Sequence, residues 1–446
     1  MMQTRRCLMV FIGLLSMGGL ALLESNAADV FLETKRSDFQ KIPIWIMGFG
    51  DGQAGGHSGK PIGVQMAEIL KADLTRSQVF EVLDAPMAPS EFSNSNCQAT
   101  EPLAKAKESG ATVSTWGRIG RKNGKLVMEA CAYDGGNENL DMGKRYVGGP
   151  ITLNLLRLMV HRWADELVSR YTGDPGIART KIAYVSEDVN GNRNLYVMDY
   201  DGFGPKRVTA DRRLSLMPAW SPDKRSVVYT TYKKNNQEIV QIHLASGSKK
   251  SLVKAKSLNI TPAFSPNGAL LAFASASEGN SDIYTLDLTT QEKVKLTFDS
   301  SADLSPTWSP NGREIAFTSD RGGRPQVYLM GADGSNVRRL TFKGDYNAAP
   351  AWSPRGDWIA YVCQLPKLGF KLCRITPDGQ KREQMTFGPT DEIDDSPSWA
   401  PDGRHIVFSS TRGGKSHIYL VNMDGSGLEQ LTSGGTHHSS PSWSPL

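Results

Sequence analysis

The stretch PSWSPL, residues 441–446, repeats a phrase that occurs five times earlier in the chain. The earlier copies are PAWSPDK from Pro218, PAFSPNG from Pro262, PTWSPNG from Pro306, PAWSPRG from Pro350 and PSWAPDG from Pro397. Successive copies begin 44, 44, 44, 47 and 44 residues apart. A nearly fixed period of this length is typical of proteins built from stacked structural repeats.

Each of the first five phrases is followed by an apolar strand, a loop, a second strand and a short third strand. In the unit that begins at Pro306 these strands are EIAFTS, QVYLMGADG and RRLTF. When the phrase is counted as the first strand, every unit holds four short strands separated by turns. Four strands at a period of about 40–45 residues indicate a blade of a β-propeller.

The two ends of the repeat region predict how the ring closes. Residues 181–209 supply the second, third and fourth strands of a blade, and the final phrase supplies only a first strand. Together they make one blade, so we expect six blades, with PSWSP paired to the strand at residues 182–186. Closure of this kind removes the two exposed sheet edges that an open ring would have.

An aromatic residue occupies the same position of the phrase in every unit. A ring of such side chains could stack on a ligand, or it could pack as wedges between neighbouring blades. We expect wedges, because a position shared by all blades is what a repeat core requires. The residues are Trp220, Phe264, Trp308, Trp352, Trp399 and Trp443.

The residues before the repeats predict a small α/β domain. KIPIWIMGF reads as a buried strand, apolar residues between Ile62 and Leu74 recur at helical spacing, and VFEVLD is a second strand. Asn123-Gly124 predicts the turn of a β-hairpin. Residues 152–171 predict an amphipathic helix, with apolar residues at four-residue steps.

The N-terminus has the features of a secretory signal. Arg5 and Arg6 precede an apolar run from Cys7 to Leu23, and the small residues of SNAAD follow it. The run is too short for a membrane-spanning helix, and we expect a soluble, exported monomer that does not insert into a membrane. The expected organisation is a signal peptide at 1–27, an α/β domain at 28–171, a linker at 172–180 and a six-bladed propeller at 181–446.

Charge and cysteine content narrow the function further. The net charge of +5 on 446 residues is mild, and no row of aromatic residues accompanies the basic runs, so we expect no nucleic-acid partner.

Beyond the signal lie Cys97, Cys131, Cys363 and Cys373, an even number that suggests two disulfides in an oxidising compartment. Three pairings are possible, and sequence order favours Cys97–Cys131 and Cys363–Cys373, the latter on adjacent strands of one blade.

Several motifs in the sequence could in principle hold a cofactor or a metal ion. GDGQAG, from Gly50 to Gly55, matches GxGxxG, but the expected helix begins too far downstream to meet a pyrophosphate, so we expect no dinucleotide. His437 and His438 have no His or Cys at zinc spacing nearby. Asp303, Asp394 and Asp395 offer the oxygen ligands that a hard cation prefers. Ligand type is the only feature that favours a cation site at these three residues. We therefore expect no cofactor and no resident metal.

The segment HRWADELVSRYTGDPGIARTKIAYVSE, running into six PxWSPDG-type blades, resembles the TolB family. The resemblance extends from KIPI at residue 41 to PSWSPL. It implies a non-enzymatic scaffold of the Tol–Pal system in the periplasm, which supports outer-membrane integrity and cell division. It also implies two partners: a Pal-like peptidoglycan-associated lipoprotein bound over the channel mouth, and a TolA-like inner-membrane protein bound by the mature N-terminus, here residues 29–38.

In a propeller, the loops that join the outermost strand of one blade to the innermost strand of the next share one face. We expect the lipoprotein to bind there, although each polar residue could also be an ordinary solvated turn residue. The expected rim consists of Leu258, Asn259, Thr261, Asp303, Leu304, Asn347, Asp394, Asp395, His437 and His438.

The alternative is a propeller enzyme, a hydrolase or a lyase, with its site in the channel. Similar blades occur in prolyl oligopeptidase-like hydrolases, which carry an additional α/β-hydrolase domain. The sequence has no HExxH and no GxSxG motif, and no pair of catalytic carboxylates stands out from blade to blade. We therefore expect no catalytic residues.

Overall fold

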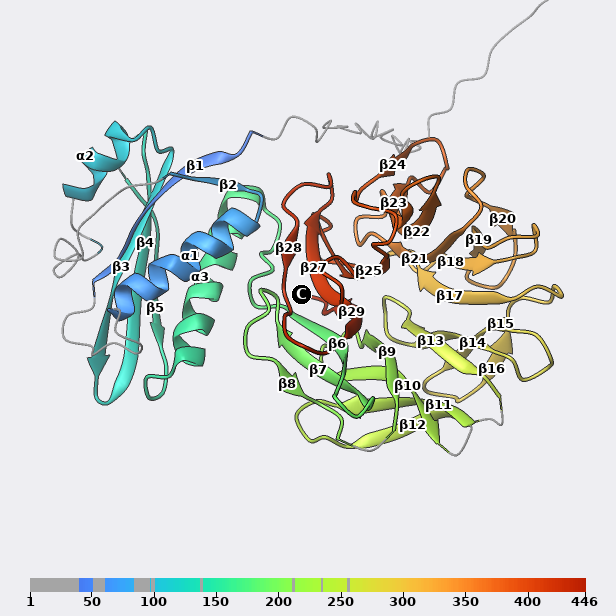
Figure 1. Cartoon of the computed structure of the whole chain (residues 1–446). Helices are drawn as coiled ribbons and strands as arrows, with labels where there is room; N and C mark the ends of the chain where they lie inside the picture. The colour runs from blue at the N-terminus through green and yellow to red at the C-terminus, as the bar shows by residue number, and fades with distance from the viewer. Residues whose placement is uncertain are drawn as a thin grey trace, which may run out of the picture. The chain divides into compact units, whose positions relative to one another are not determined.

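The computed structural model describes residues 40–50, 61–83, 97, 101–136, 139–210, 213–233, 236–254 and 257–446. The predicted signal peptide, the segment at 29–38 and most of the GDGQAG stretch lie outside the described residues. Residues Lys41–Leu446 form one compact unit, in which an α/β region precedes a ring of six sheets (Figure 1).

The α/β region is built on a five-stranded sheet in the order β2-β1-β3-β4-β5. Strand β1 runs parallel to β2 and β3, whereas the β3–β4 and β4–β5 pairs are antiparallel. The elements are β1 (Ile42–Gly50), α1 (Ile62–Arg76), β2 (Phe80–Leu83), α2 (Glu101–Glu108), β3 (Val113–Lys122), β4 (Lys125–Asp134), β5 (Leu140–Val147) and α3 (Leu153–Thr172).

Local sequence signals explain these elements. The Thr152 side chain caps α3 by accepting a hydrogen bond from the backbone N–H of Leu155 at 3.2 Å, and Gly173 ends the helix with a φ of 75°. Asn123 and Gly124 both have positive φ, 53° and 71°, as a two-residue hairpin turn requires. Helix α2 and strand β5 were not predicted, because both are short and largely polar.

The propeller contains six four-stranded sheets. Blades 1 to 5 each use four consecutive strands, which begin with β9, β13, β17, β21 and β25, and blade 6 has the order β29-β6-β7-β8. The inner strands are β9 (Ser215–Trp220), β13 (Asn259–Phe264), β17 (Asp303–Trp308), β21 (Asn347–Trp352), β25 (Asp394–Trp399) and β29 (His438–Trp443).

The remaining strands continue each blade outward from its inner strand. They are β6 (Lys181–Glu187), β7 (Arg193–Asp199), β8 (Lys206–Arg207), β10 (Ser226–Lys233), β11 (Asn236–His243), β12 (Lys249–Lys254), β14 (Leu270–Ser275), β15 (Asp282–Asp287), β16 (Lys293–Lys295), β18 (Glu314–Ser319), β19 (Gln326–Gly331), β20 (Arg338–Arg339), β22 (Ile359–Leu365), β23 (Gly369–Ile375), β24 (Arg382–Gln384), β26 (His405–Ser410), β27 (His417–Asn422) and β28 (Glu429–Gln430).

Blade 6 closes the ring as the sequence predicted. Strand β29 pairs antiparallel with β6, with His438 opposite Ser186 and Trp443 opposite Ile182. The backbone N–H of Ser444 donates to the carbonyl of Lys181 at 2.8 Å, which extends the pairing beyond the strand. The predicted fold class, a small α/β region followed by a six-bladed propeller closed by the C-terminal strand, is confirmed.

The aromatic residues of the repeated phrase are wedges between blades. The Trp308 indole N–H donates to the carbonyl of Ala263 in the preceding blade at 3.1 Å, and the Trp399 indole N–H donates to that of Ala351 at 2.9 Å. The five tryptophans are buried and Phe264 is half-buried. This position therefore belongs to the packing of the ring, as predicted.

Both predicted disulfides are present. Cys363 and Cys373 lie on the neighbouring strands β22 and β23, with Cα atoms 5.8 Å apart. Cys97 and Cys131 join the segment before α2 to β4, with Cα atoms 5.7 Å apart. Both Cα separations lie within the usual range for disulfides.

Candidate functional site

The mouth face of the propeller is defined here as the face that bears the loops between one blade and the next. The fully described loops of this kind are residues 296–302, 340–346, 385–393 and 431–437. Each leads directly into an inner strand, so the first residues of the inner strands stand at this end of the ring. The predicted rim residues come from these loops and strand starts.

Every inner strand carries the same backbone irregularity near the mouth face. The residue before its proline has a positive φ between 48° and 54°, and the pairing with the second strand shifts register there. A bulge of this kind interrupts pairing and re-aims side chains. The residues are Met217, Thr261, Ser305, Ala349, Ser396 and Ser440.

Five predicted rim residues are buried rather than exposed. Asn259, Asp303, Asn347, Asp394 and His438 each occupy the first position of an inner strand, and the first four have no solvent-exposed surface (0%). The expectation that they line an exposed rim is wrong, because polar side chains are needed there to satisfy groups where the ladder of the sheet ends.

Hydrogen bonds show what these side chains do. The Asp303 carboxylate accepts from the guanidinium of Arg321 at 2.8 Å, and that of Asp394 accepts from Arg412 at 2.9 Å. The Asn347 amide donates to the side-chain oxygen of Gln326 at 2.8 Å. The same function in three blades identifies this position as a structural support of the ring.

Asn259 and His438 fit the same pattern with other partners. The Asn259 amide donates to the carbonyl of Gln237 at 3.0 Å, and the His438 ring lies 3.1 Å from the Thr436 hydroxyl. Burial lowers the pKa of His438 to about 4, with further contributions from His417 and His437. Asp303 behaves as a buried acid: desolvation raises its pKa, although Arg321 and neighbouring hydroxyl groups oppose the shift.

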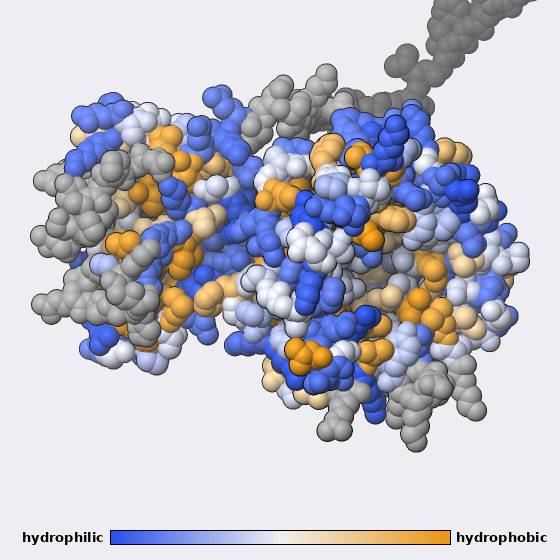
Figure 2. All heavy atoms as spheres, viewed as in Figure 1, coloured by the Kyte–Doolittle hydropathy of each residue, from blue (hydrophilic) through white to orange (hydrophobic). Residues whose placement is uncertain are grey.

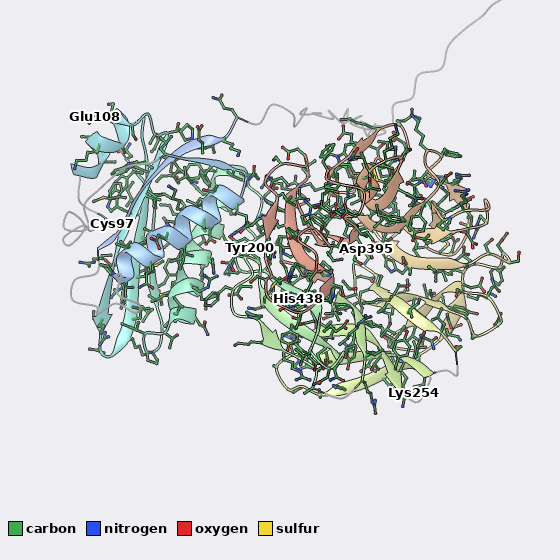
Figure 3. All side chains as sticks on the ribbon, in the orientation of Figure 1. Cys97, Glu108, Tyr200, Lys254, Asp395 and His438 are labelled. Atoms are coloured by element: carbon green, nitrogen blue, oxygen red, sulfur yellow. A yellow bond between two sulfur atoms is a disulfide. The ribbon has the colours of Figure 1, made fainter. Side chains whose placement is uncertain are left out.

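The accessible part of the predicted rim is smaller. Asp395 and His437 are exposed, whereas Leu258, Thr261 and Leu304 are half-buried. Asp395 directly follows the buried Asp394 in β25, and Figure 3 labels it on the propeller. Its carboxylate accepts from the backbone N–H of Ser396 at 2.6 Å. Although solvent reaches this carboxylate, the surrounding protein desolvates it and raises its pKa.

Three phenylalanines on the mouth face were missed by the sequence reasoning. Phe298, Phe342 and Phe387 lie in the loops after the outer strands of blades 2, 3 and 4, and they are 77%, 71% and 62% exposed. Lys295 stands over the ring of Phe298 at 5.4 Å, and Arg339 over that of Phe342 at 5.0 Å. The signal was the recurring LTF or MTF, which sequence analysis took only as the end of a strand.

Apolar side chains, drawn in orange, interrupt the polar surface of the propeller in Figure 2. Isolated exposed apolar residues are normal on a soluble protein. The three phenylalanines differ, because large aromatic residues recur at one loop position in three consecutive blades. Aromatic residues are enriched at protein interfaces, which makes this row a candidate contact surface.

The opposite side of the ring is engaged by the α/β region. The Asp174 carboxylate, just after α3, accepts from Arg355 at 2.8 Å and from Arg404 at 2.9 Å. These arginines follow the inner strands of blades 4 and 5. The predicted linker is therefore fixed to the propeller by two ion pairs.

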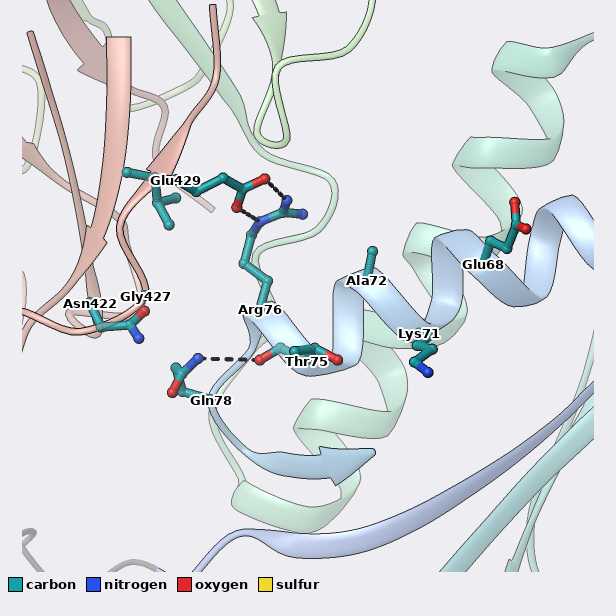
Figure 4. Close-up of a pocket in the computed structure, with 10 residues that line it drawn as sticks. Glu68, Lys71, Ala72, Thr75, Arg76, Gln78, Asn422, Gly427 and Glu429 are labelled. Carbon is teal, nitrogen blue, oxygen red and sulfur yellow. Dashed lines mark hydrogen bonds and ion pairs between the residues drawn. The ribbon is translucent and has the colours of Figure 1, made fainter. Parts of the chain in front are cut away.

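A pocket of about 480 Å³ lies between α1 and blade 5 (Figure 4). At its edge the Arg76 guanidinium binds both carboxylate oxygens of Glu429, at 2.6 and 3.1 Å. Burial disfavours the charge of Arg76, but the nearby Tyr200 and Glu429 outweigh this and raise its pKa. The bidentate pair ties α1 to β28, so this pocket is part of the junction between the α/β region and the propeller.

Beneath the junction lies a buried polar network. The Tyr200 hydroxyl donates to one carboxylate oxygen of Asp73 at 2.5 Å, and the His161 ring lies 2.6 Å from the other. Burial and the Asp73 charge raise the pKa of Tyr200 well above its ordinary value. Through Asp73 in α1, these contacts join His161 in α3 to Tyr200, which follows β7 of blade 6.

Within 40–50, 61–83 and the later described ranges, no group of three His, Cys, Asp or Glu side chains is arranged to hold a metal ion. None of the helices in these ranges is long and apolar enough to cross a membrane.

Comparison with known proteins agrees with the fold. The family model for the TolB beta propeller domain matches residues 168–446, more than half of the chain. The crystal structure of TolB from Acinetobacter baumannii superposes with a TM-score of 0.78 at 27% identity, and covers 91% of this chain and 97% of that one.

Curated relatives match over shorter segments. The Tol-Pal system protein TolB of Anaeromyxobacter dehalogenans is 35% identical over 205 residues, 45% of each chain. Its counterpart from Legionella pneumophila is 28% identical over 235 residues, 52% of each chain, and that from Desulfosudis oleivorans 34% over 138 residues, 31% of each. The chain thus spans between about a third and about half the length of these relatives, and it belongs to the TolB family.

Proposed function

We propose that this chain is a non-catalytic, periplasmic component of a Tol–Pal system, and that its mouth face docks a Pal-like peptidoglycan-associated lipoprotein. The mature N-terminus, residues 29–38, would link it to a TolA-like inner-membrane protein. The joint role is support of outer-membrane integrity and cell division. Relatives that bear the name of the Tol-Pal system favour this function over a channel enzyme.

The single observation behind the docking face is the difference between the two sides of the propeller. On one side, the turns that contain Arg355 and Arg404 are held by Asp174, and Glu429 is held by Arg76. On the mouth face, three large aromatic side chains remain exposed. A face that bears exposed aromatics is the better docking surface, because burying them on a partner is favourable.

Binding to the unlipidated soluble domain of the Pal-like lipoprotein from the same cell tests the proposal. We expect saturable binding by the full mature chain. Replacing Phe298, Phe342 and Phe387 together with Ser should weaken it at least about tenfold, because large aromatic side chains dominate interface energies. The exposed residues lie outside the core, so the thermal melting temperature should stay close to that of the parent.

The matched control is Val337→Ser. Val337 is 39% exposed and precedes the outer strand of blade 3, so it lies at the end of the blade away from the mouth face. We expect this variant to bind as the parent does. Absence of binding by the unaltered chain would overturn the proposed partner. Equal loss in the Val337 variant would overturn the proposed face.

A further inference from the structure

Two histidines meet at the junction between blades 5 and 6, beside the strand that closes the ring. His417 is the first residue of β27 in blade 5, and His438, which Figure 3 labels, is the first residue of β29 in blade 6. Their ring centroids lie 5.2 Å apart, with an angle of 75° between the ring planes. The two residues are far apart in the sequence, so the fold brings them together.

Both rings carry a nitrogen atom that the surrounding protein leaves unsatisfied. His417 and His438 are only 6% and 7% exposed. The Nδ1 atom of each ring is buried and has no hydrogen-bond partner among the residues that the structure describes. A buried polar atom without a partner costs free energy, so two such atoms on neighbouring rings need a common explanation.

The junction between blades 3 and 4 shows how the same two positions are joined elsewhere in the ring. Gln326 begins the third strand of blade 3 and Asn347 begins the inner strand of blade 4, the places that His417 and His438 hold in blades 5 and 6. The Asn347 amide donates to the Gln326 side-chain oxygen at 2.8 Å and so links the two blades directly. Between the described histidine rings there is no such hydrogen bond.

The separation of the two rings is that of a pair bound to one zinc ion. A Zn–N bond is about 2.0–2.1 Å long and an imidazole centre lies about 1.15 Å behind its nitrogen, which places each centroid about 3.2 Å from the ion. With the tetrahedral angle that zinc prefers, the two centroids are then about 5.2 Å apart. The centroids of His417 and His438 are 5.2 Å apart.

The hydrogen bond of His438 suits the form of the ring that a metal ion requires. Its Nε2 atom lies 3.1 Å from the Thr436 hydroxyl. When Nε2 carries the proton and donates it to this oxygen, Nδ1 keeps the lone pair that binds a metal. Histidines that bind metals commonly have their second nitrogen held in this way.

We propose that His417 and His438 bind one Zn²⁺, or a divalent ion of similar chemistry, through their Nδ1 atoms. Neutral imidazole suits such ions, whereas Ca²⁺ and Mg²⁺ prefer oxygen ligands. Water completes the coordination and reaches the pair from the mouth face, where the neighbouring His437 is exposed. Two protein ligands are fewer than zinc sites usually have, so we expect weaker binding than at a structural zinc site.

The ion links blade 5 to blade 6 at the place where the ring is closed without a covalent bond. This role goes beyond the proposed function and does not depend on the lipoprotein. A ligand that binds the folded state alone stabilises it, so Zn²⁺ should raise the temperature at which the closed ring melts.

The test uses the mature full chain without a histidine tag, freed of metal by a chelator. Isothermal titration calorimetry measures Zn²⁺ binding, and thermal melting is followed with and without Zn²⁺. The informative variant combines His417→Gln with His438→Asn, which installs the amide pair that Gln326 and Asn347 form between blades 3 and 4. We expect this variant to melt near the parent in the absence of metal and to lose the response to Zn²⁺.

Single substitutions define the size of the effect. His438→Asn should weaken Zn²⁺ binding at least about tenfold, because losing a ligand costs no less than losing a partner that orients one. His243→Gln in β11 is the matched control and should bind Zn²⁺ as the parent does. X-ray absorption at the zinc edge of the loaded parent needs no variant, and it should show two imidazole ligands.

Three results would overturn the site. They are a parent whose melting temperature does not respond to Zn²⁺, a combined variant that binds Zn²⁺ as tightly as the parent, and an absorption spectrum without imidazole ligands. In the first case a water molecule satisfies the two nitrogen atoms. A loss of binding confined to His437→Gln would place the ion on the exposed histidine and equally contradict the buried pair.

Discussion

Blade 4 and blade 6 are both four-stranded sheets, but they are held together in opposite ways. Blade 4 is continuous in sequence and carries a disulfide between residues 10 apart. Blade 6 combines the last strand with three strands that begin at Lys181, and it has no covalent link of its own among the described residues. The disulfide thus joins two strands that are already close together in the sequence. The contact that holds the ring together is entirely noncovalent.

The strength of the noncovalent closure lies in burial and hydrogen bonding around Trp443. This side chain is 5% exposed, and its indole N–H donates to the Thr180 hydroxyl at 2.8 Å. Its backbone N–H donates to the Ser398 hydroxyl at 3.0 Å, which joins blade 6 to blade 5. Trp443 also belongs to the hydrophobic core that contains Leu74 and Leu167 of the α/β region.

Deleting residues 437–446 should have the largest effect on this comparison. The deletion removes β29, leaves the edge of β6 unpaired and opens the core at Trp443. We expect loss of cooperative unfolding and aggregation, measured by thermal melting and size-exclusion chromatography. The control lacks only Leu446, which follows β29. A shortened chain that melted as the parent does would contradict a ring closed by this strand.

The disulfide of blade 4 should contribute less. Replacing Cys363 and Cys373 together with Ser leaves the ring closed and removes a short covalent loop. The chain-entropy estimate for such a loop is about 2–3 kcal/mol, an upper value because the hairpin forms locally in any case. Urea unfolding under oxidising conditions measures it. If the double Ser variant lost its folded structure as completely as the truncated chain, the Cys363–Cys373 disulfide, and not the pairing of β29 with β6, would hold the propeller together.

The smallest expected effect is the pH dependence of stability at blade 6, where β29 closes the ring. His438 in β29 and His417 in β27 lie with ring centroids 5.2 Å apart, and His437 and Lys415 add positive charge nearby. Burial, with these neighbours, lowers the pKa of both His417 and His438, that of His438 to about 4. The folded state therefore disfavours protonation, whereas the unfolded chain takes up protons near its ordinary pKa of about 6.5.

Stability should thus be full above about pH 6.5 and decline as the pH falls toward 4. We expect His438 to contribute on the order of 1–2 kcal/mol to this pH-dependent part of the free energy of unfolding. His438→Gln should flatten the dependence of the unfolding free energy on pH between 7.5 and 5, and His243→Gln on β11 serves as the control. An unchanged slope in the His438 variant would exclude this ring as the source.

The sequence predicted those features that local patterns encode. The repeat spacing predicted the blades and the pairing of the last strand with residues 182–186, Asn123-Gly124 predicted the hairpin, and sequence order predicted both disulfides. Helix α2 and strand β5 escaped, since their hydrophobic patterns are weak and tertiary packing decides their structure.

The candidate site was predicted less well for a physical reason. A polar residue next to a loop suggests solvent, yet Asp394 is buried and Asp395, its neighbour, is exposed. Successive strand residues point to opposite sides, so a one-residue step changes the surroundings completely. The recurrence of a polar residue three positions before each inner-strand proline was the available signal, the same kind that identified Trp308 as structural.

The pairing of His438 with Ser186 has a consequence for the order of events as the chain folds. Blades 1 to 5 each become complete as soon as their own residues are available, whereas β6 waits for a strand some 250 residues downstream. Contacts between such distant residues form slowly, because a long loop must close first. During that interval β6 presents an unpaired edge, which makes this the step at which a helper protein would be of most use.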